Sequence, residues 1–172
     1  MGQYHLLVNL DKHEYVHPHR VGDGLKLREQ VGNTGGTVAA ACMLLACSNG
    51  RGGGDFIDHT VMLQRVIGRW AGDRIAWVGD YAEEEDLRPE DHASTIYDRC
   101  YMNEAEWEEW LDENGYNAAE YPFITDISEL VAPLLEEEFG FEFTGNGWRH
   151  RRYTDGNTPQ PAMAPDMIIT FP

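Results

Sequence analysis

The chain has little cysteine, very little lysine and no long apolar run. Its 172 residues include three cysteines, Cys42, Cys47 and Cys100, too few for a disulfide scaffold. Cys42 and Cys47 lie in an apolar run without the C-x-x-C spacing of a zinc site, so we expect both to be reduced core residues. No stretch reaches the ~18 apolar residues of a membrane span, and the N-terminus lacks a basic region followed by an apolar run. These absences predict a soluble protein of the cytoplasm, or of a virion if the genome is viral, with no membrane partner.

The composition is that of a folded protein. Hydrophobic residues make up 42% of the chain and aromatic residues 11%, close to the values of globular proteins. A chain of this length is typical of a single domain, which we place at 1–172, with an acidic insert at approximately 82–121.

Charge is distributed very unevenly along the chain. The whole sequence has 30 Asp and Glu against 13 Lys and Arg, yet residues 1–80 contain eight of each. Residues 81–142 contain 20 acids and only two bases, Arg88 and Arg99. Such a segment repels phosphate backbones, which argues against direct nucleic-acid binding. It would suit a basic protein partner or simply keep the protein soluble. Only two of the 13 bases are lysine, and with the acid excess this is typical of halophilic adaptation, so solubility or salt adaptation is the simpler explanation of the acidity. A functional acidic face, including mimicry of DNA, is the alternative.

Hydrophobic periodicity and turn residues predict an alternation of strands and helices. Leu6, Val8 and Leu10 share one face of the first strand, and Asp23 is expected to cap the first helix. In chain order, the predicted elements are strands over 4–10 and 15–19, helices over 25–31 and 37–47, strands over 66–70 and 74–81, helices after Asn103 and Asp126, and strands over 141–144, 148–154 and 167–171.

Four of these elements carry a more specific expectation. Gly32 is expected to end the first helix in a left-handed conformation. The helix over 37–47 is apolar on every face and should be buried all round, and the run 75–78 should be covered on both faces. Pro133 is expected to kink or restart the last helix.

These elements predict an α+β fold, with a single domain, a mixed or antiparallel sheet, a buried central helix and acidic surface helices. The order of the strands is left open by the sequence.

The candidate metal site contains two histidines separated by a proline. His17 and His19 would point to the same face of an extended segment, and Asp80, at the end of the predicted strand over 74–81, could complete a zinc or manganese site. Only two ligands have suggestive spacing, so a hydrogen-bonded His-Pro-His turn is the alternative.

A glycine-rich loop is the candidate for binding an anionic ligand, because glycines allow backbone N–H groups to surround an anion. Its residues are Arg51, Gly52, Gly53, Gly54 and Asp55. The loop lacks the Lys-Ser/Thr ending of a nucleotide-binding P-loop, so a flexible connector is the alternative.

Several blocks of the sequence carry a resemblance: VNLDKHEYVHPH at 8–19, GDGLKL at 22–27, GGGD at 52–55, GRWAGDRI at 68–75, VGDY at 78–81 and DIS at 126–128. The chain thereby resembles a group of small uncharacterised proteins of bacteria, archaea and their viruses, a group with no known activity. The resemblance implies that the electrically neutral half is a shared scaffold and that the acidic insert is particular to this chain.

The leading functional hypothesis is a non-enzymatic accessory or interaction protein of a prokaryotic or viral genome, which presents an acidic surface to a basic protein partner. One alternative is a small metal-assisted hydrolase or anionic-ligand-binding protein that uses His17, His19 and Asp80. Another alternative is a structural component of a virion, which would form symmetric oligomers.

Overall fold

The structure is a computed structural model that describes residues 2–33, 35–52, 55–56, 61–139, 141–144 and 150–153. Its elements are β1 (His5–Asn9), β2 (Glu14–Val16), the 3₁₀ helix η1 (Pro18–Val21), α1 (Leu27–Val31), α2 (Thr37–Leu45), α3 (Val61–Val66), β3 (Ile75–Gly79), the 3₁₀ helices η2 (Glu84–Asp86) and η3 (Pro89–Asp91), α4 (Ala93–Arg99), α5 (Glu104–Asn114), β4 (Thr125–Asp126), α6 (Ser128–Phe139), β5 (Phe141–Thr144) and β6 (His150–Tyr153).

A four-stranded mixed sheet with the strand order β3-β1-β2-β4 forms the centre of the molecule. β1 is antiparallel to both of its neighbours, so that Leu7 lies opposite Val16 on one side and Trp77 on the other. β2 and β4 are parallel. A separate antiparallel pair, β5 and β6, forms the hairpin predicted near the C-terminus. The predicted α+β class is confirmed, and the strand order is new information.

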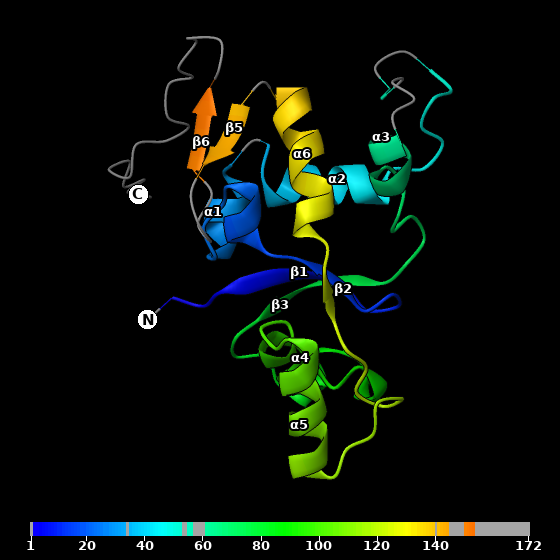
Figure 1. The fold of residues 1–172 in the computed structure, drawn as a ribbon, viewed down its shortest axis with the longest axis vertical. Coiled ribbons are helices and arrows are strands. Elements are labelled where there is room, and N and C mark those ends of the chain that lie inside the picture. The colour runs from blue at the N-terminus through cyan, green and yellow to red at the C-terminus, as the bar shows by residue number, and fades with distance from the viewer. Residues whose placement is uncertain are drawn as a thin grey trace, which may run out of the picture.

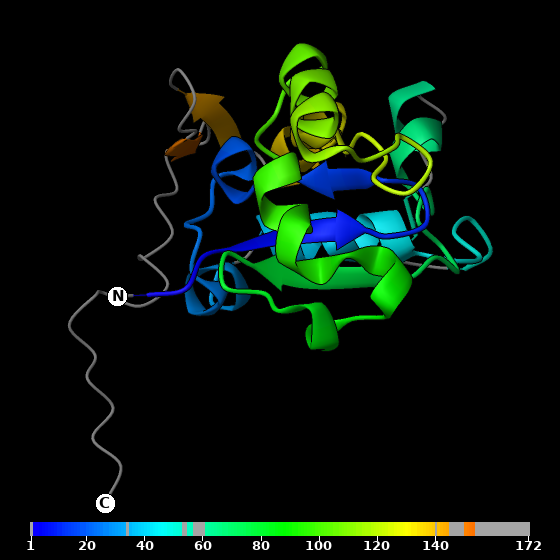
Figure 2. The ribbon, with the colours of Figure 1, turned by 90° about the horizontal axis from the view of Figure 1, so that it is seen from below.

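Helices lie on both faces of the sheet (Figure 1). α2 and α6 cover one face, where they pack against Leu7 and Val16. The insert between β3 and β4 covers the other face, and Figure 2 shows its helices crossing in front of the strands. Each face of the sheet has its own hydrophobic core. The first core lies under α2 and α6 and contains Leu7, and the second core lies under the insert and contains Leu6 and Val8. Successive residues of β1 therefore enter opposite cores, as the period of two in a strand requires.

The central strand makes a large contribution to the stability of both cores. Leu6, Leu7 and Val8 are each at most 1% exposed. Burial of one such side chain contributes about 1.5–3 kcal/mol before conformational entropy is subtracted. β3 is also covered on both faces as predicted, because Trp77 packs against the first core and Val78 against the second.

The strand predicted over 66–70 is wrong. α3 ends at Val66, and the following residues form turns that bind the end of α2, with hydrogen bonds from Gly68 N to Met43 O at 2.9 Å and from Trp70 N to Leu44 O at 2.8 Å. Gly68 has a φ of 74°, and a Cβ atom there would lie 2.7 Å from the carbonyl oxygen of Ala46. The close approach of two chain segments, rather than strand pairing, determines this region.

The structure also corrects four predictions about α1 and α2. Cys42 and Cys47 are exposed, so α2 is open on one side and these two cysteines are not core residues. Asp23 caps α2 by accepting a hydrogen bond from Thr37 N, instead of capping the first helix. Gly32 ends α1 in the right-handed region, with a φ of −79°.

The region around His17 differs from the predicted return strand over 15–19. β2 ends at Val16, and Pro18 begins η1, because its fixed φ suits the first position of a helical turn. Pro133 lies inside α6, which continues from Ser128 to Phe139, so it does not restart the helix.

Local signals predicted α5 correctly. Asn103 Oδ1 accepts a hydrogen bond from Glu106 N at 3.0 Å, and the side chain of Glu106 accepts one from Asn103 N at 2.9 Å. The helix ends at Gly115, with a φ of 68°, which favours glycine. The strand predicted over 167–171 lies outside the described residues. None of the described helices is both long and apolar enough to cross a membrane.

Candidate functional site

Two blocks that are far apart in the sequence form a network of polar contacts, which we call the polar framework. It joins Asn9, Asp11, Lys12 and Glu14 around the β1–β2 turn to Arg69, Trp70, Asp73 and Arg74 before β3. Its centre is Glu14, which is 8% exposed. Glu14 accepts from Arg69 Nε at 2.8 Å and Nη2 at 2.5 Å, and from Trp70 Nε1 at 2.8 Å. Burial raises the pKa of Glu14, but the hydrogen bonds from Arg69 and Trp70 outweigh it, so the pKa lies below its ordinary value.

The rest of the polar framework also pairs opposite charges. Arg74 Nε donates to Asp11 at 2.8 Å, and its Nη1 lies 3.0 Å from both carboxylate oxygens of Asp91. Lys12 forms an ion pair with Asp73, which also accepts a hydrogen bond from Asn9 at 2.8 Å. The charged residues of the two sequence blocks therefore hold the fold together, a role that sequence reasoning missed.

The second region is the acidic layer, defined as residues 82–121 with η2, η3, α4 and α5. It contains 14 Asp and Glu and only two Arg. On α5, Glu104, Glu108, Glu109 and Glu113 are exposed, and none of them has a Lys or Arg partner within 4.0 Å among the described residues. These carboxylates are free to attract a positively charged surface.

Aromatic side chains lie beside this helix. Tyr121 stacks on His92 and on Tyr116, with ring centroids 4.2 Å apart in both pairs. Trp110 meets the edge of Tyr121 at 5.6 Å. Tyr116 remains 39% exposed. Carboxylates next to partly exposed tyrosine and tryptophan rings form a surface suited to lysine and arginine side chains.

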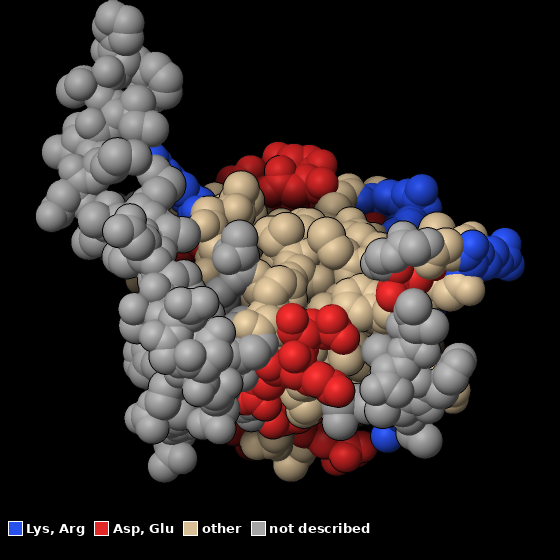
Figure 3. Space-filling view, turned by 90° about the horizontal axis from the view of Figure 1, so that it is seen from above, with Lys and Arg blue, Asp and Glu red and all other residues tan. Residues whose placement is uncertain are grey.

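Not all acids of the segment 81–142 lie in the acidic layer. Glu137 and Glu138 are exposed on α6, which covers the opposite face of the sheet. Figure 3, viewed from that side, shows acidic side chains there as well. The expectation of one acidic surface is therefore corrected to two separate groups of carboxylates. The acidic layer contains the larger number, 14 of the 20 acids of residues 81–142.

His17 and His19 do lie together in the structure. Their ring centroids are 5.3 Å apart, and they line a groove of about 580 Å³, the histidine groove, with Arg20, Tyr101 and Asp126. His17 Nδ1 accepts a hydrogen bond from His19 N at 3.2 Å, and His17 N donates to Ser128 Oγ at 2.8 Å. The hydrogen-bonded His-Pro-His turn that was the alternative prediction is thus present.

The protonation of His17 follows from its burial. Burial, together with the neighbouring His19, lowers the pKa of His17 to about 4, and Asp126 opposes this shift only in part. His17 is therefore neutral at pH 7, consistent with Nδ1 acting as a hydrogen-bond acceptor. A neutral imidazole can act as a metal ligand or as a general base.

Asp80 is not placed with the two histidines. It follows β3, two strands away from β2 in the sheet, and its Oδ1 accepts a hydrogen bond from Tyr4 N at 2.9 Å. Within the residues that the structure describes, no three His, Cys, Asp or Glu side chains are grouped so that they could hold a metal ion. His17, His19 and Asp80 thus do not form one site here, and the zinc or manganese ion stays a prediction.

In the glycine-rich loop, a carboxylate of the chain already occupies the backbone donors. Asp55 Oδ2 accepts hydrogen bonds from the N–H groups of Gly50, Arg51 and Gly52 at 2.8–2.9 Å. These bonds lower the pKa of Asp55. Gly53 and Gly54, which complete the predicted ligand site, lie outside the described residues. An external anion would have to displace Asp55, so anion binding by this loop also stays a prediction.

Comparison of the chain with protein-family models, with curated proteins and with solved structures found no match. The resemblance based on the sequence blocks is not tested by these comparisons and stays a prediction.

Proposed function

We propose that this protein is a non-enzymatic accessory protein that uses the acidic layer to bind a basic protein partner. One observation carries the proposal. The cationic groups Lys12, Arg69 and Arg74 of the polar framework each pair with a carboxylate, whereas the exposed carboxylates of α5 have no such partner among the described residues.

The chemistry of the surface defines the class of partner. A row of exposed carboxylates on one helix provides long-range attraction, and the partly exposed Tyr116 and Trp110 provide apolar contact area. A segment rich in lysine and arginine would satisfy both, because the ammonium or guanidinium group pairs with Glu while its methylene stem or planar face packs on the rings.

The experiment removes equal charge from two faces. A basic partner captured on the immobilised protein at low salt is purified, and its affinity is measured again. The double variant Glu108→Gln with Glu109→Gln is expected to weaken binding about tenfold at low salt, since surface charge pairs are each worth up to about 1 kcal/mol. The matched control, Glu137→Gln with Glu138→Gln on α6, loses the same charge and is expected to change the affinity less than twofold.

Two outcomes would contradict the proposal. Equal weakening by both double variants would assign the acidity to overall charge, as in halophilic adaptation. Unchanged binding in the α5 variant would remove the acidic layer from the interface. Symmetric self-assembly of the purified chain, measured by light scattering, would favour the virion component instead.

A second candidate is a small metal-assisted hydrolase centred on the histidine groove, and the observation that favours it is the 5.3 Å separation of His17 and His19 beside Arg20 and Tyr101. Titration with zinc or manganese, followed by the imidazole NMR signals, tests this candidate. The signals of His17 and His19 should shift together at one equivalent of metal, and the other histidines should not. Unchanged signals and an unchanged melting temperature would remove it.

A further inference from the structure

A buried arginine in the acidic layer has no carboxylate partner. Arg99, the last residue of α4, is 3% exposed, and its Nη1 donates to the carbonyl oxygen of Pro122 at 3.0 Å. Its Nε is buried without an acceptor among the described residues, and none of their carboxylates lies within 4.0 Å of the guanidinium. A buried guanidinium without a carboxylate partner is energetically unfavourable, so an anionic group beside it in an adjoining cavity would be bound favourably.

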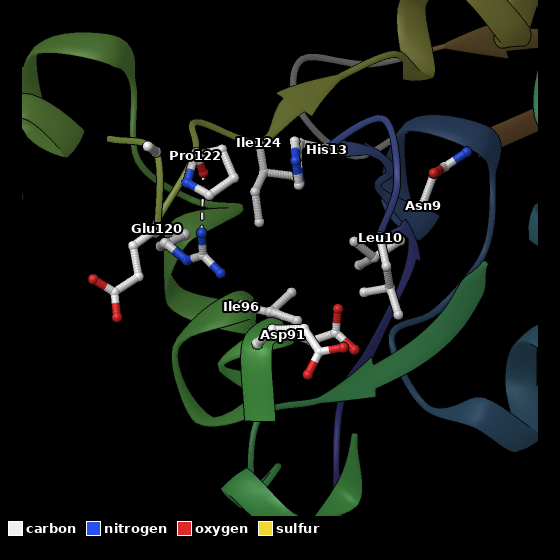
Figure 4. Close-up of a pocket in the computed structure, with 12 residues that line it drawn as sticks. Asn9, Leu10, His13, Asp91, Ile96, Glu120, Pro122 and Ile124 are labelled. Carbon is white, nitrogen blue, oxygen red and sulfur yellow. Dashed lines mark hydrogen bonds between the residues drawn. The ribbon is translucent and has the colours of Figure 1, made fainter. Parts of the chain in front are cut away.

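Arg99 lines a cavity of about 100 Å³ between the acidic layer and the sheet. Figure 4 shows the surrounding side chains, with Leu10, Ile96 and Ile124 forming an apolar wall and His13 near one end. Such a volume can hold about three water molecules or an organic ligand of a few heavy atoms. Burial, followed by the charge of Arg99, lowers the pKa of His13, which is therefore neutral at pH 7 and can donate one N–H.

Three carboxylates also line the cavity, but two of them have hydrogen-bond partners. Asp91 is held by Arg74, and Glu120 accepts a hydrogen bond from Asn117 Nδ2 at 3.1 Å. The third, Glu90, is exposed and has no ion pair among the described residues. The cavity lining therefore combines a buried cation that has no carboxylate partner with the exposed carboxylate of Glu90, which has no ion pair among the described residues.

We propose that this cavity, the Arg99 pocket, binds a small α-amino acid of the size of glycine or alanine. The planar guanidinium of Arg99, which lines the cavity, would hold the ligand carboxylate, and Glu90 would hold the ammonium group. The apolar wall suits a Cα or methyl group. A divalent anion such as phosphate is disfavoured, because the surrounding carboxylates would repel it more strongly than a zwitterion. This site goes beyond the proposed function, since it does not depend on a protein partner.

Binding is tested with four probes: glycine, L-alanine, acetate and methylammonium. Binding during each titration is measured by calorimetry and by the NMR signal of the Arg99 Nε–H, which is protected from exchange because it is buried. Glycine and alanine are expected to shift this signal, with acetate binding at least tenfold more weakly and methylammonium leaving it in place. The proposal is overturned if neither amino acid shifts the signal, if acetate binds as tightly as glycine, or if a crystal grown with glycine shows only water in the cavity beside Arg99.

Substitution of Glu90 separates the pocket from the general field of the acidic layer. Glu90→Gln lies on the surface and should not affect folding. It is expected to weaken glycine binding about tenfold and to leave acetate binding unchanged or slightly tighter, because a nearby negative charge is removed. The matched control is Glu85→Gln, an exposed acid of the same layer outside the cavity, with less than a twofold effect. Equal effects of the two variants on glycine would overturn the assignment of the ammonium to Glu90. Arg99→Lys, which keeps the charge but loses the planar fork, should weaken glycine binding at least tenfold, measured by calorimetry.

Discussion

The polar framework and the acidic layer use the same charged side chains in opposite ways. In the polar framework, the carboxylates of Asp11, Glu14 and Asp73 each face a cation and connect the β1–β2 turn to the chain before β3. In the acidic layer, the carboxylates of α5 point outward without Lys or Arg partners among the described residues. The comparison shows that a charged residue in this protein stabilises the fold where it is partly buried and paired, and remains available for association where it is exposed and unpaired.

The largest expected effect tests the polar framework. Glu14→Gln replaces the buried acceptor of Arg69 and Trp70 with a neutral group, so the free energy of unfolding should fall by about 2–3 kcal/mol, measured by urea denaturation. Because the folded pKa of Glu14 lies below its ordinary value, its stabilisation is present above the unfolded pKa and is lost as the pH falls through the folded pKa. The wild-type and variant proteins should therefore become closer in stability below about pH 4. A difference of less than 0.5 kcal/mol at pH 7 would contradict the comparison.

The next effect concerns His17, which is buried and uncharged. Its folded pKa of about 4 lies below the ordinary 6.5, so between these values the unfolded chain takes up a proton that the folded protein does not. Stability should fall by about 2 kcal/mol from pH 7.5 to pH 5 because of this group. His17→Gln should remove that part of the pH dependence, measured as the difference between urea unfolding curves of the two proteins. His13 and His19 contribute equally to both and cancel. Parallel curves would show that the pKa of His17 is the same in the folded and unfolded protein.

A smaller effect is expected on the exposed side of the comparison. Glu108→Gln, Glu109→Gln and Glu113→Gln should each change the free energy of unfolding by less than about 0.5 kcal/mol, because these side chains are exposed and lack cationic partners among the described residues. Added salt should stabilise the wild-type protein slightly more than the triple variant, since it screens the repulsion between carboxylates. Destabilisation of more than 1 kcal/mol by any one of the three would place that carboxylate in a structural role.

The last prediction compares thiols and needs no substitution. Cys42 and Cys47 are exposed in the neutral half, whereas Cys100 is 2% exposed beneath the acidic layer, where burial raises the pKa of its thiol. Two thiols should react rapidly with a disulfide reagent in the folded protein, and the third only in urea. Rapid reaction of all three would indicate that the acidic layer opens readily from the sheet.

Some parts of the fold could be predicted from short sequence patterns. Asn103, Glu106 and Gly115 determined the ends of α5, because capping hydrogen bonds join residues only a few positions apart. The alternation of Leu6, Val8 and Leu10 predicted which face of β1 is buried in the second core, because the period of two in a strand is also a property of neighbouring residues. The close placement of His17 and His19 also followed from sequence proximity, although the segment between them is a 3₁₀ turn and not a strand.

The incorrect predictions involve contacts between distant segments. Val66–Trp70 has the composition of a strand, but Gly68 and Trp70 bind the end of α2 instead. The apolar run of α2 gave no indication that Cys42 would be left uncovered. Asp80 could not be excluded from the histidine groove until the strand order placed it two strands away.

The sequence by itself determined the alternation of helices and strands, the neutrality of the first half and the acidity of the insert. Only the tertiary structure decided which charges are paired, that the acids lie on two faces, and that Arg99 is buried without a carboxylate beside a cavity. The physical reason is the range of the interactions. Periodicity and capping act within one or two turns of chain, whereas the Glu14–Arg69 pair joins residues 55 positions apart and exists only because the sheet brings them together.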